Sequence, residues 1–185
     1  QGRVTPVAGL TPIVREYQFR RVAEGDERAL AWIRGAVPDA LRAPLVMEAY
    51  LRHEEALLWS VVTPSGDDDG VECVWLLRTS DALTRGEADP HRAALVAHYG
   101  APRRSAYALM GRYLLGDVAL DEVLALATTP KRRAEVAYFV GLRAQASGHS
   151  AEASDWYQLA GLVGAQGVAE TGWASEALKA LSERD

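Results

Sequence analysis

Small residues at fixed positions in two consecutive helical stretches constrain the fold of this chain more than any other feature. Val140 and Ala144 are four residues apart, so they stack on one face of a helix, and Gly141 adjoins that face. Ala153 lies in the helical stretch that follows. Antiparallel helices pack about 8–10 Å apart, and a large side chain at Gly141 or Ala153 would push them further apart. The sequence therefore predicts a closely packed helical hairpin over residues 134–160.

The turn of this hairpin is marked by its residue types. Gly148 interrupts the apolar pattern, and Ser150 is a suitable N-cap for the second helix. Tyr157 and Ala160 continue the inner face that Ala153 begins. We therefore expect one helix on each side of Gly148, with Ser150 capping the second.

This arrangement resembles the tetratricopeptide repeat (TPR), a helix-turn-helix unit of about 34 residues. Ala137 and Ala144 depart from the pattern, because the family often has Trp and Tyr there. An ordinary hairpin in a helical bundle is the alternative. The matching positions are Val140 and Gly141 at the Leu-Gly pair of the first helix, Gly148 at the turn, and Ala153, Tyr157 and Ala160 at the small, aromatic and closing positions of the second helix.

Helix-breaking and capping residues divide the first part of the chain into further helices. We expect a first helix that begins at Ile13 and ends at Gly25, and a second that Asp26 caps. A short helical turn should follow. The longest helix of this part is expected to begin at Pro44 and to end before Pro64.

Weaker copies of the repeat pattern precede the clear one. Trp75 and Gly86 are separated as the first-helix aromatic and the turn glycine are in the TPR family, which makes this stretch at best a degenerate repeat. Gly111 matches the first-helix glycine of a further unit, whose second helix is expected to be short and to start at Asp117 or Asp121. A last amphipathic helix would cover the apolar face that a repeat stack leaves open at its end.

Composition supports an all-α fold, because Ala, Leu, Arg and Glu dominate the 185 residues and runs of β-branched residues are almost absent. The expected architecture is a short TPR-like solenoid of stacked antiparallel hairpins with a C-terminal capping helix. The predicted organisation is a flexible lead-in (1–12) and a single helical domain (13–185), made of a helical N-terminal part (13–70), a degenerate repeat (71–103), a shortened repeat (104–133), the best repeat (134–165) and the capping helix (166–185).

The last third of the chain is also similar to the C-terminal part of bacterial TPR lipoproteins of the NlpI type. The segments that carry this resemblance are AEVAYFVGLRAQASG, WYQLA and GVAETGWASEALKAL. It implies a protein of the bacterial cell envelope or periplasm, held at the outer membrane by an N-terminal lipid and acting as an adaptor for other proteins. The lipid-bearing cysteine would lie upstream of Gln1, and it would be the chain's only link to a membrane. A cytoplasmic location is the alternative.

Charge and residue types argue against several other functions. A net charge of −5 disfavours nucleic acid as a partner, because phosphate binding requires a basic surface. Cys73 is the only cysteine, so it forms no intrachain disulfide. The adjacent acidic residues at 67–69 lack the alternate spacing of a calcium loop, and the four histidines lack the spacing of metal ligands. We therefore expect no cofactor, no metal ion and no catalytic residue.

A binding role suits stacked hairpins, because the first helix of each pair lines a concave groove. Tyr138 and Arg112 are the strongest candidate anchors, since aromatic and guanidinium groups contribute much of the binding energy at interfaces. The alternative is that Tyr138 packs against the neighbouring hairpin. The positions left after the packing residues are removed predict a partner-binding groove of Ser105, Ala108, Arg112, Glu135, Tyr138, Leu142 and Gln145.

Three classes of function follow. The first is a non-catalytic adaptor or scaffold that binds a peptide or partner protein, with a homodimer left open. The second is a structural subunit of a multiprotein envelope machine that uses its convex surface or its N-terminal surface, where Trp32, Trp59 and Trp75 occur. The third is an enzyme, which would require a pocket and an acid with a raised pKa.

Overall fold

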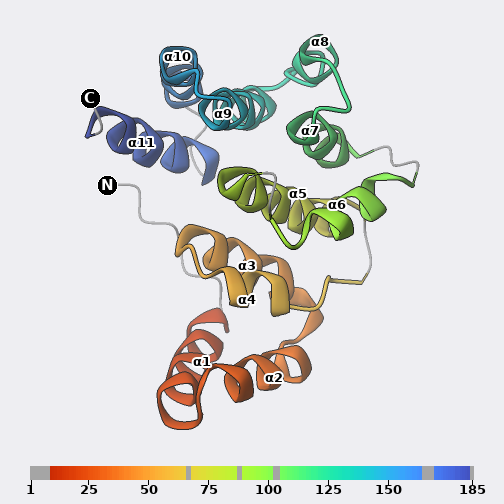
Figure 1. Ribbon diagram of the computed structural model, residues 1–185, viewed down its shortest axis with the longest axis vertical. Coiled ribbons are helices and arrows are strands. Elements are labelled where there is room, and N and C mark those ends of the chain that lie inside the picture. Colours follow the sequence, from red (N-terminus) through yellow and green to blue (C-terminus); the bar gives the residue numbers. More distant parts are fainter. Residues whose placement is uncertain (1–8, 66–67, 87–88, 102–104, 164–168, 184–185) are drawn as a thin grey trace. The chain divides into compact units, whose positions relative to one another are not determined.

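The computed structural model describes residues 9–65, 68–86, 89–101, 105–163 and 169–183 and is built of helices (Figure 1). No strand occurs in these ranges, which confirms the all-α class. None of the helices there is long and apolar enough to cross a membrane. Their bounds are α1 Leu10–Glu24, α2 Asp26–Ala36, α3 Asp39–Leu51, α4 Glu55–Ser60, α5 Asp68–Arg85, α6 Arg92–Tyr99, α7 Ala106–Leu115, α8 Leu120–Leu124, α9 Pro130–Ala146, α10 Ser150–Leu162 and α11 Ala169–Ser182.

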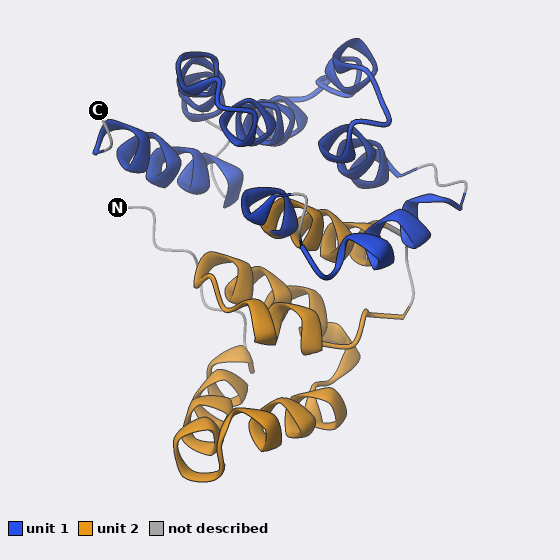
Figure 2. Ribbon diagram, in the orientation of Figure 1, with its two compact units in different colours: residues 1–4, 82–185 blue, residues 5–81 orange. Residues whose placement is uncertain are grey.

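The chain forms two compact units, which are coloured separately in Figure 2. The N-terminal unit contains α1 to α4 and α5 as far as Asp81. The C-terminal unit begins at Ala82 and contains the end of α5 and α6 to α11. Each unit has its own buried apolar residues.

In the N-terminal unit, α1 packs on α2 and α3, and α4 packs on α2 and α3. Gly25 separates α1 from α2 as expected, because its φ of 90° suits glycine and stops the first helix. Asp26 is the first residue of α2 and Gly25 is its N-cap, so the predicted capping by Asp26 is wrong. Ala29 and Ile33 of α2 are buried together with Tyr17 of α1.

The long helix expected to begin at Pro44 is wrong in its start and in its continuity, although the helical stretch does end before Pro64, at Ser60. It begins earlier, because the predicted helical turn and the long helix are one element, α3, which holds Pro44 inside it. It breaks at His53, whose φ of 55° is a left-handed conformation that ends an α-helix. The short helix α4 follows after this break.

Arg78 of α5 binds the C-terminal end of α4 within the N-terminal unit. Its side chain is buried, and its Nε and Nη2 donate hydrogen bonds to the carbonyl oxygens of Leu58 (3.2 Å) and Val61 (2.6 Å). The guanidinium lies 5.3 Å from the ring centroid of Trp59 and 5.1 Å from that of Trp75. Carbonyl groups at a helix C-terminus lack helical partners, so Arg78 supplies the donors that α4 needs there.

In the C-terminal unit, α9 is the central helix, since it packs against α7, α8, α10 and α11. Helix α11 also packs against α10, and α7 packs against α6 and α8. Helix α8 is a short helix of five residues, as expected of the shortened unit, but it begins at Leu120 rather than at either predicted aspartate. Pro130 is the first residue of α9.

The predicted close approach at Gly141 is confirmed. A Cβ atom added there would lie 2.8 Å from Cε1 and 2.9 Å from Cδ1 of Tyr157, closer than real Cβ contacts. Tyr157 is fully buried, and its hydroxyl group donates a hydrogen bond of 2.6 Å to Oε1 of Gln145. Helices α9 and α10 therefore interlock through a glycine on one and a tyrosine ring on the other.

The turn between α9 and α10 differs from expectation in its cap. Gly148 has a φ of 81° and ends the first helix, as predicted. Ser150 is the first residue of α10 and His149 is its N-cap, so the predicted Ser150 cap is wrong. Thr129 caps the start of α9, where its hydroxyl group accepts a hydrogen bond from the Arg132 backbone N–H at 3.2 Å.

Gly111 makes a different contact from Gly141, although both match the same repeat position. A Cβ atom at Gly111 would overlap the hydroxyl group and ring of Tyr99, which belongs to α6. The tyrosine that faces Gly111 thus precedes it in the chain, whereas Tyr157 follows Gly141. Helix α7 therefore uses its glycine to pack on α6, the preceding helix, rather than on α8.

Candidate protein-binding surfaces and a buried carboxylate cluster

The predicted groove residues lie mostly inside the C-terminal unit. Every residue from Ala134 to Leu142 is buried, because α9 has neighbouring helices on several sides. A partner would reach only the half-buried members of the predicted set. Ala108, Glu135, Tyr138 and Leu142 are buried, whereas Ser105, Arg112 and Gln145 are half-buried.

Two of the half-buried members have roles within the fold. The Ser105 hydroxyl group caps α7 by accepting a hydrogen bond of 3.1 Å from the Tyr107 backbone N–H. Gln145 accepts the hydrogen bond of Tyr157 described above. Arg112 is the remaining half-buried candidate from the predicted groove. The groove itself stays a prediction.

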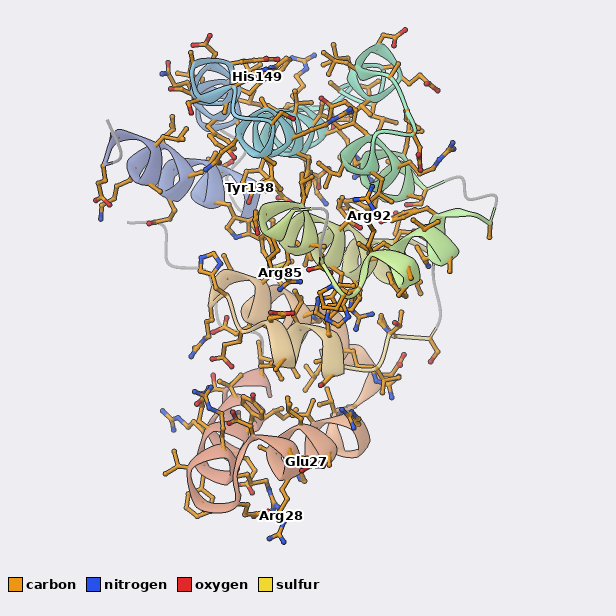
Figure 3. The ribbon with its side chains drawn as sticks, in the orientation of Figure 1. Glu27, Arg28, Arg85, Arg92, Tyr138 and His149 are labelled. Carbon is orange, nitrogen blue, oxygen red and sulfur yellow. The ribbon has the colours of Figure 1, made fainter. Side chains whose placement is uncertain are left out.

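Tyr138 lies in an aromatic cluster at the junction of α9, α10 and α11 (Figure 3). Its ring centroid is 5.4 Å from that of Trp173 on α11 and 5.8 Å from that of Tyr157 on α10. Phe139 is also in contact, with a centroid distance of 5.1 Å. Only 5% of Tyr138 is exposed, so in the folded unit its ring packs α9, α10 and α11 together.

A charged group also lies in this interior. Glu135 on α9 is 1% exposed, and its Oε2 accepts a hydrogen bond of 2.8 Å from Nη1 of Arg132. Its Oε1 accepts a hydrogen bond of 3.1 Å from the Tyr107 hydroxyl group on α7, and Nζ of Lys131 lies 3.6 Å away. The Arg132 guanidinium stacks 4.4 Å from the centroid of the Tyr107 ring. A buried carboxylate requires such partners, because its desolvation is otherwise unfavourable.

Glu170, in the first turn of α11, approaches the same cluster. Burial raises the pKa of its carboxyl group to about 7, and the negative charge of Glu135 adds to this rise. Its own backbone hydrogen bond and the charges of Lys131 and Arg132 act in the opposite direction without cancelling the rise. Glu170 is therefore a carboxyl group that titrates near neutral pH, whereas Glu135 is held by the donors of Arg132 and Tyr107.

Two helices each carry a pair of exposed large apolar side chains. On α10, Leu159 is 44% exposed and Leu162 is 82% exposed. On α1, Phe19 is 65% exposed and Val22 is 89% exposed. The members of each pair are three residues apart, so each pair lies on one side of its helix. We call these pairs the α10 apolar surface and the α1 apolar surface.

Other candidate chemistry is sparse in the described ranges. No group of three or more His, Cys, Asp or Glu residues that could hold a metal ion occurs there. Cys73 is half-buried. Of the acidic residues at 67–69, Asp67 lies outside the described residues and Asp69 lies inside α5.

Sequence reasoning missed Arg78 and Glu170. The signal for Arg78 was its position three residues after Trp75, which places both side chains on one side of a helix. Glu170 had no such signal, because its pKa depends on contacts with a different helix.

Comparison with known proteins adds no family to this description: no family model matches the chain, and no curated protein or solved structure is significantly similar to it.

Proposed function

We propose that this chain is a non-catalytic scaffold that binds a partner protein, built on TPR-like helical hairpins. The observation that carries the proposal is the α10 apolar surface. Leu162 is 82% exposed beside Leu159, and large exposed apolar side chains that share one helix side are typical of protein-binding surfaces.

The packing of α9, α10 and α11 supports the TPR-like part of the proposal. The glycine of the first helix meets the aromatic residue of the second helix, and the closing helix packs on both. In such a stack the second helices form the outer face. The α10 apolar surface therefore favours a contact on the outer, convex face over one in the predicted groove.

A second candidate surface is favoured by its own observation. Phe19 and Val22 on α1 are 65% and 89% exposed, and both would be desolvated by a partner. This surface fits the structural subunit that uses its N-terminal part. The bacterial envelope location, with its adaptor role for other envelope proteins, remains a proposal that rests on the NlpI-type resemblance.

Paired charge substitutions test the proposal. We expect Leu159→Asp/Leu162→Asp to lower the recovery of a cross-linked partner from a bacterial envelope extract at least about 10-fold, because hot-spot residues contribute about 2 kcal/mol or more. Quantitative mass spectrometry after chemical cross-linking measures the recovery. Val96→Asp is the matched control, since Val96 is a 57% exposed apolar residue on α6.

The other arms separate the alternatives. Loss of the partner with Phe19→Asp/Val22→Asp alone assigns binding to the α1 apolar surface. Loss with Arg112→Ala alone assigns it to the predicted groove. Recovery that no variant changes overturns the proposal that these surfaces bind a protein. Tyr138→Ala is unsuitable as a probe of the groove, because Tyr138 is buried among the aromatic rings of the core.

A further inference from the structure

The α10 apolar surface continues into an acidic residue. Asp155 lies four residues before Leu159 and seven before Leu162, so the three side chains form a row along one side of α10. Asp155 is exposed, and it takes part in no recorded ion pair with another described residue. We call these three residues the α10 row. It presents one negative charge followed by two exposed apolar side chains.

The α1 apolar surface has the same spacing with the opposite charge. Arg15 lies four residues before Phe19 and seven before Val22, on the same side of α1. The other two arginines of this helix pair with carboxylates, whereas the exposed Arg15 has no recorded ion pair among the described residues. We call these three residues the α1 row.

The match between the two helices extends to the residues inside each row. Tyr-Gln-Phe at 17–19 of α1 corresponds to Tyr-Gln-Leu at 157–159 of α10. In both helices the tyrosine is buried, which turns the charged and apolar residues of the row to the outer side. The two rows therefore present the same arrangement of side chains, with a positive charge on α1 and a negative charge on α10.

This arrangement suits a parallel pairing of the two helices. Steps of four and then three residues are those of the d, a and d positions of a heptad, at which parallel helices pack in layers. Two α10 rows would oppose carboxylates, two α1 rows would oppose guanidinium groups, and an antiparallel alignment would place each charge against apolar residues. An α1 row beside a parallel α10 row matches every layer. The layers are Arg15 with Asp155, Phe19 with Leu159, and Val22 with Leu162.

We propose that the α1 row of one chain binds the α10 row of a second copy, with the two helices parallel. The inference rests on the proposed role of the α10 apolar surface in protein binding, and it names a second copy of this chain as the partner. The contact joins different helices of the two copies, so it is heterologous. Burial of the two apolar layers drives the association, and the charged layer sets its register and orientation.

Sedimentation velocity of the purified full chain measures the association. A contact of three layers is small for a protein interface, so we expect a weak complex with a dissociation constant of about 10–1000 µM. The weight-average sedimentation coefficient should therefore rise with concentration over this range. The paired aspartate substitutions of the α10 apolar surface and those of the α1 apolar surface should each remove this rise, because each pair loses both apolar layers.

Reversing one charge tests the pairing of the rows. Arg15→Asp should weaken the association at least about 10-fold, because it places two carboxylates in one layer. Asp155→Arg should weaken it to a similar degree, because it places two guanidinium groups there. Arg92→Asp is the matched control, since Arg92 is exposed on α6 outside both rows and its substitution changes the net charge equally. This control should associate like the unchanged chain.

An equimolar mixture of Arg15→Asp and Asp155→Arg gives the sharpest result. Each variant offers the other an opposite charge at both contacts, although each repels its own copies. We therefore expect the mixture to associate nearly as strongly as the unchanged chain, about 10-fold more strongly than either variant alone. The double variant that carries both substitutions in one chain should behave in the same way.

Four results would overturn the inference. They are a purified chain that stays monomeric over the whole concentration range, an Arg92→Asp control that is as weak as Arg15→Asp, a mixture that associates no more than the single variants, and an association that depends on the α10 apolar pair but not on the α1 apolar pair. The first result is decided by the unchanged chain alone. It would leave the binding of a different protein to the cross-linking experiment above, so the two failures are distinguishable.

Discussion

The α9–α10 hairpin and the α4–α5 junction each hold two helices together, but through contacts of opposite kinds. In the hairpin, the absence of a side chain at Gly141 leaves room for the Tyr157 ring, and the helices approach through apolar atoms. At the junction, Arg78 fills the space with a long polar side chain and supplies donors to the free carbonyl groups of α4. The first contact depends on complementary shape. The second depends on hydrogen bonds within the protein, which replace the hydrogen bonds to water that the buried groups lose.

This difference determines which substitutions each region tolerates. A shape-based contact fails when volume is added, because a packed interior resists overpacking. A contact based on hydrogen bonds fails when the donor is removed, because the buried acceptors are then left unsatisfied.

Arg78→Met should have the largest effect, a loss of about 3 kcal/mol in the free energy of unfolding of the N-terminal unit. The methionine fills part of the volume but leaves the carbonyl groups of Leu58 and Val61 without their donor, at about 1–3 kcal/mol each, offset in part by relief of guanidinium desolvation. Urea unfolding followed by tryptophan fluorescence measures the loss, since Trp59 and Trp75 contact Arg78.

Arg78→Lys is the informative companion, because it keeps the charge but loses the planar fork that reaches two carbonyl groups. We expect it to lie between the unchanged chain and the methionine variant. If the methionine variant is as stable as the unchanged chain, the hydrogen bonds of Arg78 only balance its desolvation, and the contrast between the two regions fails.

Gly141→Ala should destabilise the C-terminal unit by about 1–2 kcal/mol. Overpacking against the Tyr157 ring costs about 1–3 kcal/mol, and the higher helix propensity of alanine returns up to about 1 kcal/mol. Gly161→Ala is the matched control on α10, because no atom lies within 4 Å of an added Cβ there. The control should be neutral or slightly stabilising, and equal effects at both glycines would refute the interlock.

Gly111→Ala should have the smallest effect, below about 1 kcal/mol, although its added Cβ overlaps Tyr99 more closely. The atoms that overlap at Gly111 are at the far end of the Tyr99 side chain, which a small rotation displaces, whereas the atoms that meet Gly141 are the Cδ1 and Cε1 ring edge of Tyr157 and the Cβ of Trp156, which lie nearer the backbone. Calorimetric unfolding of Gly111→Ala and of Gly111→Ala/Tyr99→Leu, each compared with its parent, gives the coupling energy. A loss greater than that of Gly141→Ala would reverse this ranking.

Local features of the fold were predictable from the sequence. The hairpin around Gly148, the close approach at Gly141 and the end of α1 at Gly25 all follow from residue types a few positions apart. The break at His53 was not predictable, because no glycine or proline marks it. At His53 the backbone N–H groups of His53 and Glu54 donate to the carbonyl oxygens of Tyr50 and Ala49, so a histidine closes α3 in the way that a glycine usually does.

The candidate site was less predictable, because burial depends on how many helices surround a given helix. The groove prediction assumed that α9 has an open side, but α7, α8, α10 and α11 pack around it, so Glu135 and Tyr138 are buried. The exposed Leu162 carried no signal either, since a leucine at a helical position usually indicates the core. Contacts between distant residues, such as Tyr107 with Glu135, set both outcomes.

The buried guanidinium of Arg78 gives the two units unequal responses to acid and base. Burial lowers the pKa of Arg78 only to about 10, so the side chain keeps its proton, and the α4–α5 junction keeps its donors, throughout the range in which Glu170 titrates. A titration from mild acid to mild base therefore changes the charge of Glu170 in the C-terminal unit. The α4–α5 junction of the N-terminal unit keeps its charge and serves as an internal reference.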